Sequence, residues 1–521
     1  MTTSLDLVPT LRSLRELGRF HEAAALVRDL DPQTMTAQLH WVAGSALAAV
    51  SEYETAGMHL MLASLDVGLA PGALAKLAEV SWVKHDYVRG RAFAIEGLAI
   101  DPSNRGCRIQ LHRNEDGLAQ GRRNLRGKLG HAAFFADPQG NAGDLVLTDA
   151  VRRCFRRDTG PDSWHSVHVH QLFDERRLAE VNSADALIVG GGGLFLPDTA
   201  PNGNSGWQWN VPDDMLRRID VPLVVFAVGY NMFEGQQFEG QQFDSRDFSG
   251  FRDSRFRHSL RTLVERSAFF GLRNHGSVRR VQELLPDELA GRVRWQPCPT
   301  TFTQLLGGPS ARLLGGPSAR LPGEPVPAPG AVLLNCAYDR AGRRFGDSYG
   351  QFLAQLRDWV VSTRKRAPVE YVAHCVDDEK FVIDLRREHG ITLPMIALYD
   401  RTVPEIHDVY RRARLVVGMR GHAAMIPFGC GTPTISLISH PKLGYFLDDI
   451  ERPEWGLSIR DPRLGARLQE LTNELLDSYP EVVADIGRIQ QRLHQVTLEN
   501  IRSLPGVLHP GEPIGKDAEG E

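Results

Sequence analysis

Residues 413–442 read ARLVVGMRGHAAMIPFGCGTPTISLISHPK. An apolar run leads into Arg420 and His422, and a stretch of small and apolar residues that favours a helix follows. A second apolar run, Thr434–Ile438, comes shortly before Lys442. Alternating buried strands and helices are typical of a parallel α/β sheet, which binds ligands at the carboxyl ends of its strands. The segment therefore predicts an α/β lobe with Arg420, His422 and Lys442 at its ligand-binding edge.

The same alternation extends over most of the chain from His131 onward. The predicted strands form two series, 131–136, 166–173, 186–189, 223–228, 268–272 and 293–295, and then 331–336, 369–374, 415–417 and 434–438. A Gly- and Pro-rich segment, 305–330, separates the series and is interpreted as a linker. We therefore predict an α/β fold with two Rossmann-like lobes, at 126–304 and 331–505. The polar tail, 506–521, is predicted to be disordered.

The first 125 residues favour helices, because Ala, Leu, Glu and Arg dominate and strand-like runs are absent. Phe20, Tyr53 and Tyr87 recur at spacings of 33 and 34 residues in similar contexts. A period near 34 with an aromatic residue where two helices meet resembles tetratricopeptide repeats. Such repeats usually bind proteins. We predict a tetratricopeptide-like helical region at 1–125, and three unrelated helix pairs are the alternative.

Composition excludes several classes of protein. The net charge is −4, so no global basic field points to nucleic acid. Six widely spaced cysteines form no CxxC pair, which argues against a zinc site or a disulfide framework and suits a reducing compartment. We expect a cytoplasmic protein, at most peripheral to the inner face of the membrane, because no signal-like or ~18–20-residue apolar run is present. The tandem copies of EGQQF (234–243) and LLGGPSAR (305–320) are interpreted as tolerated loop insertions.

Two glycine-containing stretches of the first lobe follow predicted strands. Gly140–Asp144 comes after the first strand, and Gly190–Gly193 comes after the third. Glycine lets backbone N–H groups approach a ligand, and a helix N-terminus favours anions. The glycines match neither a dinucleotide-binding nor a Walker pattern. Tight turns, with Asp144 as a helix cap, are the alternative. The predicted substrate-binding residues of these stretches are Asn141, Asp144, Gly191, Gly192 and Gly193.

Three further residues are predicted to bind substrate. Arg273 directly follows an apolar run and lies at the same edge of the sheet, although a surface salt bridge would explain it equally well. Trp207 lies among amide side chains and suits stacking on a sugar, with a place in the core as the alternative. His374 ends a strand and suits acceptor hydroxyls, with a solvated acidic helix start beside it as the alternative. Arg420 offers a planar donor for a carboxylate or phosphate, and His422 can deliver a proton.

These elements occur in an order that resembles the polysaccharide pyruvyl transferase family over about Ala132 to Asp449. The motifs are Asn141-x-Gly-Asp144, Asp185–Val189 with Gly190–Gly193, Leu272-Arg273-x-x-x-Ser277, Cys298-Pro299, Arg420-x-His422-Ala423 and Gly431-Thr432-Pro433 with Lys442. The resemblance implies a two-lobed, glycosyltransferase-B-like fold. It also implies transfer of an enolpyruvyl-derived unit from phosphoenolpyruvate to a sugar, giving a pyruvate ketal and phosphate. Asn274 stands where many members carry Asp.

The resemblance also implies roles for individual residues. Arg273, Arg420, His422 and Lys442 would bind the donor, with His422 as general acid and Arg420 as its catalytic partner. No cofactor or metal is expected, since phosphoenolpyruvate is a substrate, and the acceptor would be a glycan of exopolysaccharide or cell-envelope biosynthesis. A protein partner could bind the repeats. The alternatives are a sugar-nucleotide-dependent glycosyltransferase of the same fold and a repeat-bearing scaffold with an inactive α/β part.

Overall fold

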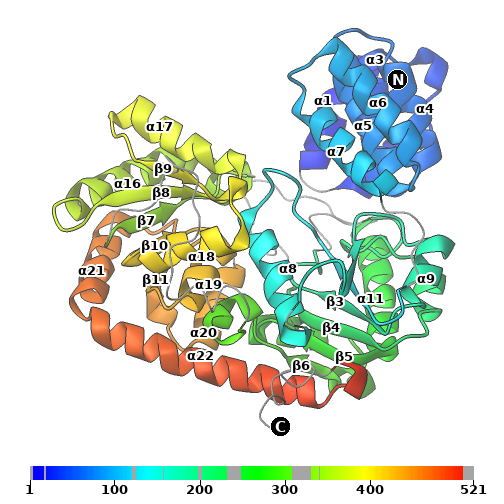
Figure 1. Ribbon diagram of the computed structural model, residues 1–521. Coiled ribbons are helices and arrows are strands. Elements are labelled where there is room, and N and C mark those ends of the chain that lie inside the picture. Colours follow the sequence, from blue (N-terminus) through cyan, green and yellow to red (C-terminus); the bar gives the residue numbers. More distant parts are fainter. Residues whose placement is uncertain are drawn as a thin grey trace, which may run out of the picture.

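The structure is a computed structural model, and it describes residues 4–16, 19–119, 125–156, 158–196, 202–230, 248–307, 330–339, 341–439 and 441–508. The predicted fold class is confirmed, because two α/β lobes follow a helical region (Figure 1). The EGQQF duplication, residues 308–329 of the linker and residues 509–521 of the tail lie outside the described residues.

The first lobe contains a six-stranded parallel sheet in the order β2-β1-β3-β4-β5-β6. Its strands are β1 (Leu129–Ala133), β2 (Trp164–His168), β3 (Ala186–Gly190), β4 (Leu223–Val228), β5 (Ser267–Leu272) and β6 (Val293–Trp295). Its helices are α8 (Ala142–Phe155), α9 (Glu175–Val181), α10 (Asp213–Arg217), α11 (Phe248–Arg266), α12 (His275–Gln282) and α13 (Asp287–Ala290). The chain order changes direction between β1 and β3, and ligands bind at such a switch point in open α/β sheets.

The second lobe contains a parallel sheet in the order β9-β8-β7-β10-β11-β12. Its strands are β7 (Val332–Asn335), β8 (Val369–Ala373), β9 (Met395–Ala397), β10 (Leu415–Gly418), β11 (Thr434–Ile438) and β12 (Gly456–Ser458). Its helices are α15 (Ala341–Phe345), α16 (Tyr349–Thr363), α17 (Glu379–His389), α18 (Val403–Arg412), α19 (Gly421–Gly429), α20 (Pro441–Asp449), α21 (Leu464–Asp477) and α22 (Tyr479–Arg502). The switch point of this sheet lies between β7 and β10, directly before Arg420.

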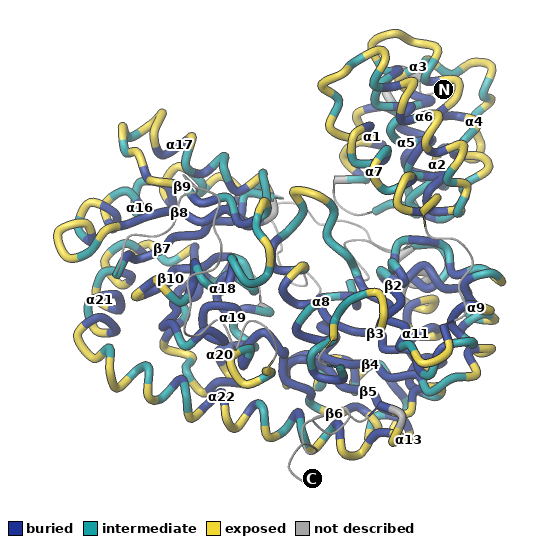
Figure 2. Tube along the Cα trace, viewed as in Figure 1, coloured by how far each residue is buried: buried dark blue, intermediate teal, exposed yellow. Residues whose placement is uncertain are grey.

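The ten strands predicted from the sequence all form, within a few residues of their expected bounds. Two edge strands, β9 and β12, were not predicted. Each is only three residues long, which is too short to show a hydrophobic period. The strands of both sheets are buried, whereas the outer surfaces of the covering helices are exposed (Figure 2).

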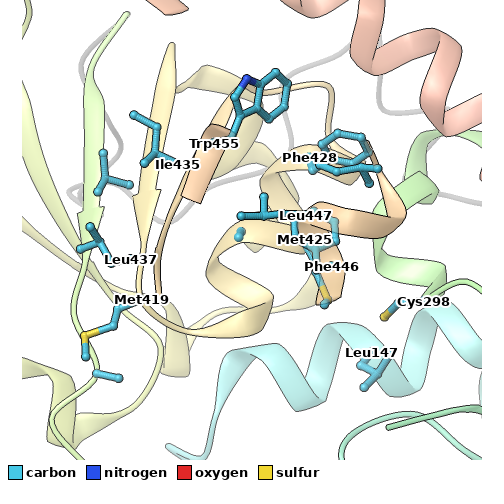
Figure 3. Close-up of a cluster of buried hydrophobic side chains, with 14 of the residues drawn as sticks. Leu147, Cys298, Met419, Met425, Phe428, Ile435, Leu437, Phe446, Leu447 and Trp455 are labelled. Carbon is cyan, nitrogen blue, oxygen red and sulfur yellow. The ribbon is translucent and has the colours of Figure 1, made fainter. Parts of the chain in front are cut away.

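One hydrophobic cluster contains residues of both lobes. Leu147 of α8 and Cys298 belong to the same buried cluster as Met425 and Phe428 of α19 (Figure 3). Helix α22 runs from the second lobe beneath both lobes (Figure 1), and its Thr497 accepts a hydrogen bond from Gln296 of the first lobe at 2.9 Å. The lobes are therefore joined by packing as well as by the linker.

The helical region comprises three helix pairs and a closing helix above the first lobe (Figure 1). Its helices are α1 (Ser4–Glu16), α2 (Phe20–Arg28), α3 (Ala37–Ala49), α4 (Tyr53–Ala63), α5 (Ala70–Val83), α6 (Tyr87–Ile100) and α7 (Arg105–Ala119). The turn within the second pair recurs 34 residues later, with Ser51 and His85 both at positive φ and Tyr53 and Tyr87 both opening the next helix. No described helix has both the length and the apolar character required to span a bilayer.

Candidate active site

A cavity of about 100 Å³ lies where the carboxyl ends of the two sheets face each other. It is lined from the first lobe by Asn141, Asp144, Gly192, Gly193 and Arg273, and from the second by Arg344, Met419, Arg420, Gly421, His422, Met425 and Lys442. Of the residues predicted for the site, all but Gly191, Trp207 and His374 line it. The sheet-edge argument thus brings residues from distant parts of the chain together.

The first turn of α8 faces this cavity. Asn141 caps the helix, since its side chain accepts a hydrogen bond from the Gly143 N–H at 2.9 Å. The alternative in which Asp144 caps the helix is therefore wrong: Asp144 lies inside the first turn and lines the cavity. Burial raises its pKa to about 6, although Arg420 and other nearby cations act in the opposite direction.

Arg273 extends from the end of β5 across the glycine loops of the first lobe. A Cβ on Gly229 would lie only 2.3 Å from Arg273 Nε, and one on Gly193 would lie 3.5 Å from Nη2, so glycine leaves room for the guanidinium. Gly191 and Gly192 have φ values of +82° and +89°, which favour glycine. Arg273 is 7% exposed, and among the described residues its Nε has no hydrogen-bond partner. Burial lowers its pKa.

Arg420 is held in place by carboxylates of the second lobe. Its Nε donates to Asp378 Oδ2 at 2.9 Å, and its Nη2 donates to Asp378 Oδ1 and to Asp339 Oδ1, each at 2.6 Å. The Arg420 backbone N–H also donates to Asn335 Oδ1 at 3.3 Å, across the switch point between β10 and β7. Burial disfavours the charge, but Asp378 and Asp339 outweigh it and raise the pKa of Arg420 well above its usual value. Much of its positive charge is therefore balanced by the protein.

His422 lies in the first turn of α19 and packs against the opposite lobe. A Cβ on Gly143 would lie 2.7 Å from His422 Cβ, so the glycine at this position allows the imidazole to approach α8. In the described part of the chain, the buried His422 Nε2 has no hydrogen-bond partner. Burial first, and then the positive charge of Arg273, lower the pKa of His422 well below its usual value. The ring is therefore neutral at pH 7 when no anion is bound.

Lys442 and Arg344 complete the cationic lining. Burial, with Arg273 and Arg344 nearby, lowers the pKa of Lys442 to about 7. Arg344 is 7% exposed, and its Nη2 donates to Asp339 Oδ2 at 3.0 Å while its Nη1 donates to Ser439 Oγ at 2.9 Å. Asp339 thus links Arg344 to Arg420. The arginines of the second lobe are fixed by carboxylates, whereas Lys442 titrates near neutrality.

Asn274, which stands where related proteins often carry Asp, performs a capping role. Its side chain accepts a hydrogen bond from the Ser277 N–H at 2.7 Å at the start of α12. Both Asn and Asp are favoured caps, so the departure from the family pattern keeps the turn geometry. The same helix is tied to the second lobe by His275, whose ring contacts Asp449 at 2.9 Å.

Besides Gly191, two predicted residues do not line the cavity. Trp207 is fully buried and its Nε1–H donates to Ser259 at 3.0 Å, so it offers no face for a sugar to stack on. Its apolar indole packs edge-to-face against Phe195, and this contact stabilises the core of the first lobe. His374 is also fully buried, with its Nε2 2.5 Å from the Tyr410 hydroxyl, and burial lowers its pKa to about 4. Its carbonyl oxygen instead accepts the Ala142 N–H of α8 at 2.9 Å, which links the lobes.

Several important residues were not predicted. Asp378 lies in the stretch after His374 for which a solvated acidic helix start was the alternative, yet it is fully buried beneath Arg420. Asp339 follows the end of β7, so the argument applied to Arg273 would have found it. Arg344 lies in a polar stretch, where an arginine gives no signal in the sequence. No group of three described His, Cys, Asp or Glu side chains is placed to hold a metal ion.

Comparisons with known proteins give similar structures and one matching family. The structure resembles an O-GlcNAc transferase of Thermobaculum terrenum with 13% identity and a TM-score of 0.37, covering 96% of this chain and 98% of that one. It also resembles a UDP-GlcNAc 2-epimerase from Neisseria meningitidis, with 8% identity, a TM-score of 0.38 and coverage of 71% and 100%. No curated protein sequence matches the chain. A model of the polysaccharide pyruvyl transferase family matches residues 120–441, which contain every residue that lines the cavity except Lys442, the next residue beyond the match. The chain therefore belongs to the polysaccharide pyruvyl transferase family.

Proposed function

We propose that this enzyme transfers the enolpyruvyl-derived unit of phosphoenolpyruvate to two hydroxyls of a sugar, giving a cyclic pyruvate ketal and inorganic phosphate. The family membership supports pyruvyl transfer to a polysaccharide. The donor and the ketal product are the part that we propose from the chemistry of the cavity.

The observation that carries the proposal is a cluster of buried cationic and imidazole groups around one cavity. Among the described residues, Arg273 Nε and His422 Nε2 have no hydrogen-bond partner. Lys442 has its pKa lowered to about 7 by burial and by neighbouring cations. Buried polar groups are normally satisfied, so this arrangement favours an anionic ligand. Phosphoenolpyruvate carries a carboxylate and a phosphate on a frame of three carbons.

The size of the cavity also favours a compact donor. Its volume of about 100 Å³ is below the ~300–1,000 Å³ that is usual for drug-sized ligands. We assign the phosphate to Arg273 and Lys442, and the carboxylate to the donors of Arg420 and the N-terminus of α8. Asp378 keeps the Arg420 guanidinium in one orientation, and fixed charges of this kind stabilise developing charge most effectively.

The proposed reaction needs one proton donor and one proton acceptor. The anionic donor raises the pKa of His422 when it binds, so the imidazole takes up a proton and delivers it to the methylene carbon. A sugar hydroxyl attacks the neighbouring carbon and gives its proton to Asp144. A second hydroxyl then bonds to the same carbon as the bond to phosphate breaks, which closes the ketal. The proton of this hydroxyl leaves with the phosphate, and Asp144 returns its proton to solvent, from which His422 is protonated again. Positioned proton transfer contributes about 10²–10⁴-fold to such rates.

The setting of the reaction follows from its substrates. Phosphoenolpyruvate is made in the cytoplasm, so we place the enzyme there, with a glycan acceptor of exopolysaccharide or cell-envelope biosynthesis. The helix pairs with their recurring 34-residue turn support a tetratricopeptide-like region, and we propose that its outer surface binds a protein partner.

Binding calorimetry tests the choice of donor. The full-length protein is titrated with phosphoenolpyruvate and, separately, with UDP-sugars. We expect saturable binding of phosphoenolpyruvate that weakens at least tenfold in Arg273→Ala. Preferential binding of a UDP-sugar, with no response to phosphoenolpyruvate, would contradict the proposal and favour a glycosyltransferase.

A further inference from the structure

The helical region lies outside the matched family segment, but it contacts the loop that leads to Asn141 and to Asp144 in the first turn of α8. Arg113 of α7 donates to Asp137 with Nε to Oδ1 and Nη2 to Oδ2, both at 2.6 Å. Asp137 lies in the connection from β1 to α8, seven residues before Asp144. Helix α7, the last helix of the helical region, is therefore bound by an ion pair to the loop between β1 and α8.

The ion pair is rigidly built. The Arg113 guanidinium lies 4.5 Å from the ring centre of Trp82, and the Trp82 ring meets His168 edge-on at 4.8 Å at the end of β2. The side chains of Arg113 and Asp137 are only 14% and 20% exposed. A planar, two-point Arg–carboxylate pair fixes orientation as well as distance, and partial burial reduces screening by solvent.

The pair is connected to the cavity by a short stretch of backbone. The Asp137 carbonyl accepts the Gly140 N–H at 2.8 Å, which closes a tight turn, and Gln139 within it has a φ of +60°. Asn141, which directly follows this turn, caps α8. At the far end of the loop, the Ala142 N–H donates to the second lobe. The loop is thus held by the helical region at one end and by the second lobe at the other.

The rest of the helical region is docked firmly enough to act as a support. Leu172 of the first lobe donates its N–H to the Val83 carbonyl at 2.9 Å and accepts from His85 Nε2 at 2.8 Å. Asn210 Nδ2 donates to the Tyr53 hydroxyl at 2.6 Å. These bonds involve residues in or beside the two turns that recur after 34 residues. The surface that docks on the first lobe therefore includes the repeated turns.

We infer that Arg113 is a positioning residue, through which the helical region sets the place of Asn141 and Asp144 in the active site. The helical region then contributes to turnover and is more than a platform for assembly. The inference rests on the proposed function for its kinetic consequence, since Asp144 acts there on the sugar hydroxyl. Small displacements of a reacting group can lower a rate by about 10²-fold.

The test uses the full-length protein and four variants. Arg113→Ala and Asp137→Asn each break the pair, their double variant measures coupling, and Arg91→Ala is a matched control. Arg91 pairs with Glu115 at 3.1 Å on the same region, but both side chains are about half exposed. Amide hydrogen exchange across 134–144 is measured together with kcat and KM for phosphoenolpyruvate.

We expect exchange in the loop to accelerate at least tenfold in either single variant, with no further increase in the double variant. We also expect kcat to fall about tenfold while KM changes less, and Arg91→Ala to match the unmodified protein. Unchanged exchange, or normal kcat with a faster-exchanging loop, would overturn the inference. A protein that never turns over phosphoenolpyruvate would refute the proposed function, whereas the exchange result would still decide whether Arg113 positions the loop. If Arg113→Ala unfolds the helical region, Asp137→Asn tests the inference in its place.

Discussion

Arg420 Nε lies 2.9 Å from Asp378 Oδ2, and Arg420 Nη2 lies 2.6 Å from Asp378 Oδ1, so a fully buried carboxylate orients the arginine at the N-terminus of α19. Asp378 also accepts hydrogen bonds from the Asn335 side chain and the His374 N–H. This carboxylate connects β7, β8 and β10 beneath the cavity. Arg420 therefore acts as a fixed donor whose position depends on residues that the ligand never touches.

Asp378→Asn is expected to impair both stability and activity. Removing one member of a buried ion pair costs about 3–5 kcal/mol, and a misplaced Arg420 should lower kcat about tenfold or more. Thermal unfolding and steady-state kinetics measure the two effects. Asp408→Asn is the control, because its pair with Arg412 is on the surface and should contribute at most about 1 kcal/mol. Equal behaviour of the two variants would rule out the positioning role of Asp378.

His422→Gln is expected to lower kcat by about 10²–10⁴-fold, the usual contribution of a positioned acid. The dissociation constant for phosphoenolpyruvate should change much less, since Arg273 and Lys442 remain. The Tm should stay close to that of the unmodified protein, because His422 lacks a hydrogen-bond partner at Nε2 among the described residues. Turnover that survives this substitution would assign proton delivery to another group, and Asp144 would be the next candidate.

The affinity for phosphoenolpyruvate should weaken as the pH rises from 7 to 9. The pKa of Lys442 is lowered to about 7, so the free protein carries a neutral amine at higher pH and must take up a proton to bind an anion. Affinity should then fall by up to about tenfold per pH unit in this window. The ligand phosphate is fully ionised above pH 7, since its last pKa is about 6. Lys442→Arg should lose the part of the pH dependence that Lys442 contributes, and an unchanged pH profile in that variant would show that another group titrates.

Trp207→Phe is expected to lower stability without affecting acceptor recognition. The substitution removes the hydrogen bond to Ser259, worth about 1 kcal/mol, and leaves a gap in a fully buried cluster. The Tm should fall, while KM for the acceptor stays within about twofold of its original value. A selective increase in KM with unchanged Tm would restore the idea that this indole stacks on a sugar.

The sequence predicted the sheets and most of the cavity because both depend on local order along the chain. Strands with strong apolar patterns and residues at their carboxyl ends, such as Arg273 and His422, are brought together by any parallel sheet. Burial was harder to predict. Trp207 and His374 carry polar groups that suggested exposure, yet Ser259 bonds to Trp207 Nε1 and Tyr410 bonds to His374 Nε2 inside the protein. Those partners lie 52 and 36 residues away, so no local pattern reveals them.

The contact between Arg113 and Asp137 is another case in which no local sequence pattern revealed a partner that is distant along the chain. The repeat spacing predicted a separate helical region that would bind a partner, and the sequence left open whether it folds back on the lobes. An ion pair between residues 24 positions apart joins α7 to the active-site loop. Charged residues are common on any helix, so their pairing emerges only from the fold.

Product analysis with ¹³C-labelled phosphoenolpyruvate tests the central claim most directly. The enzyme is incubated with the labelled donor and a panel of oligosaccharides that carry neighbouring free hydroxyls, and products are examined by mass spectrometry and NMR. The account predicts a glycan that carries the three labelled carbons as a methyl group, a carboxylate and a ketal carbon, with one phosphate released for each ketal. Transfer of a sugar from a UDP-sugar to the same panel, with the label left in phosphoenolpyruvate, would contradict it.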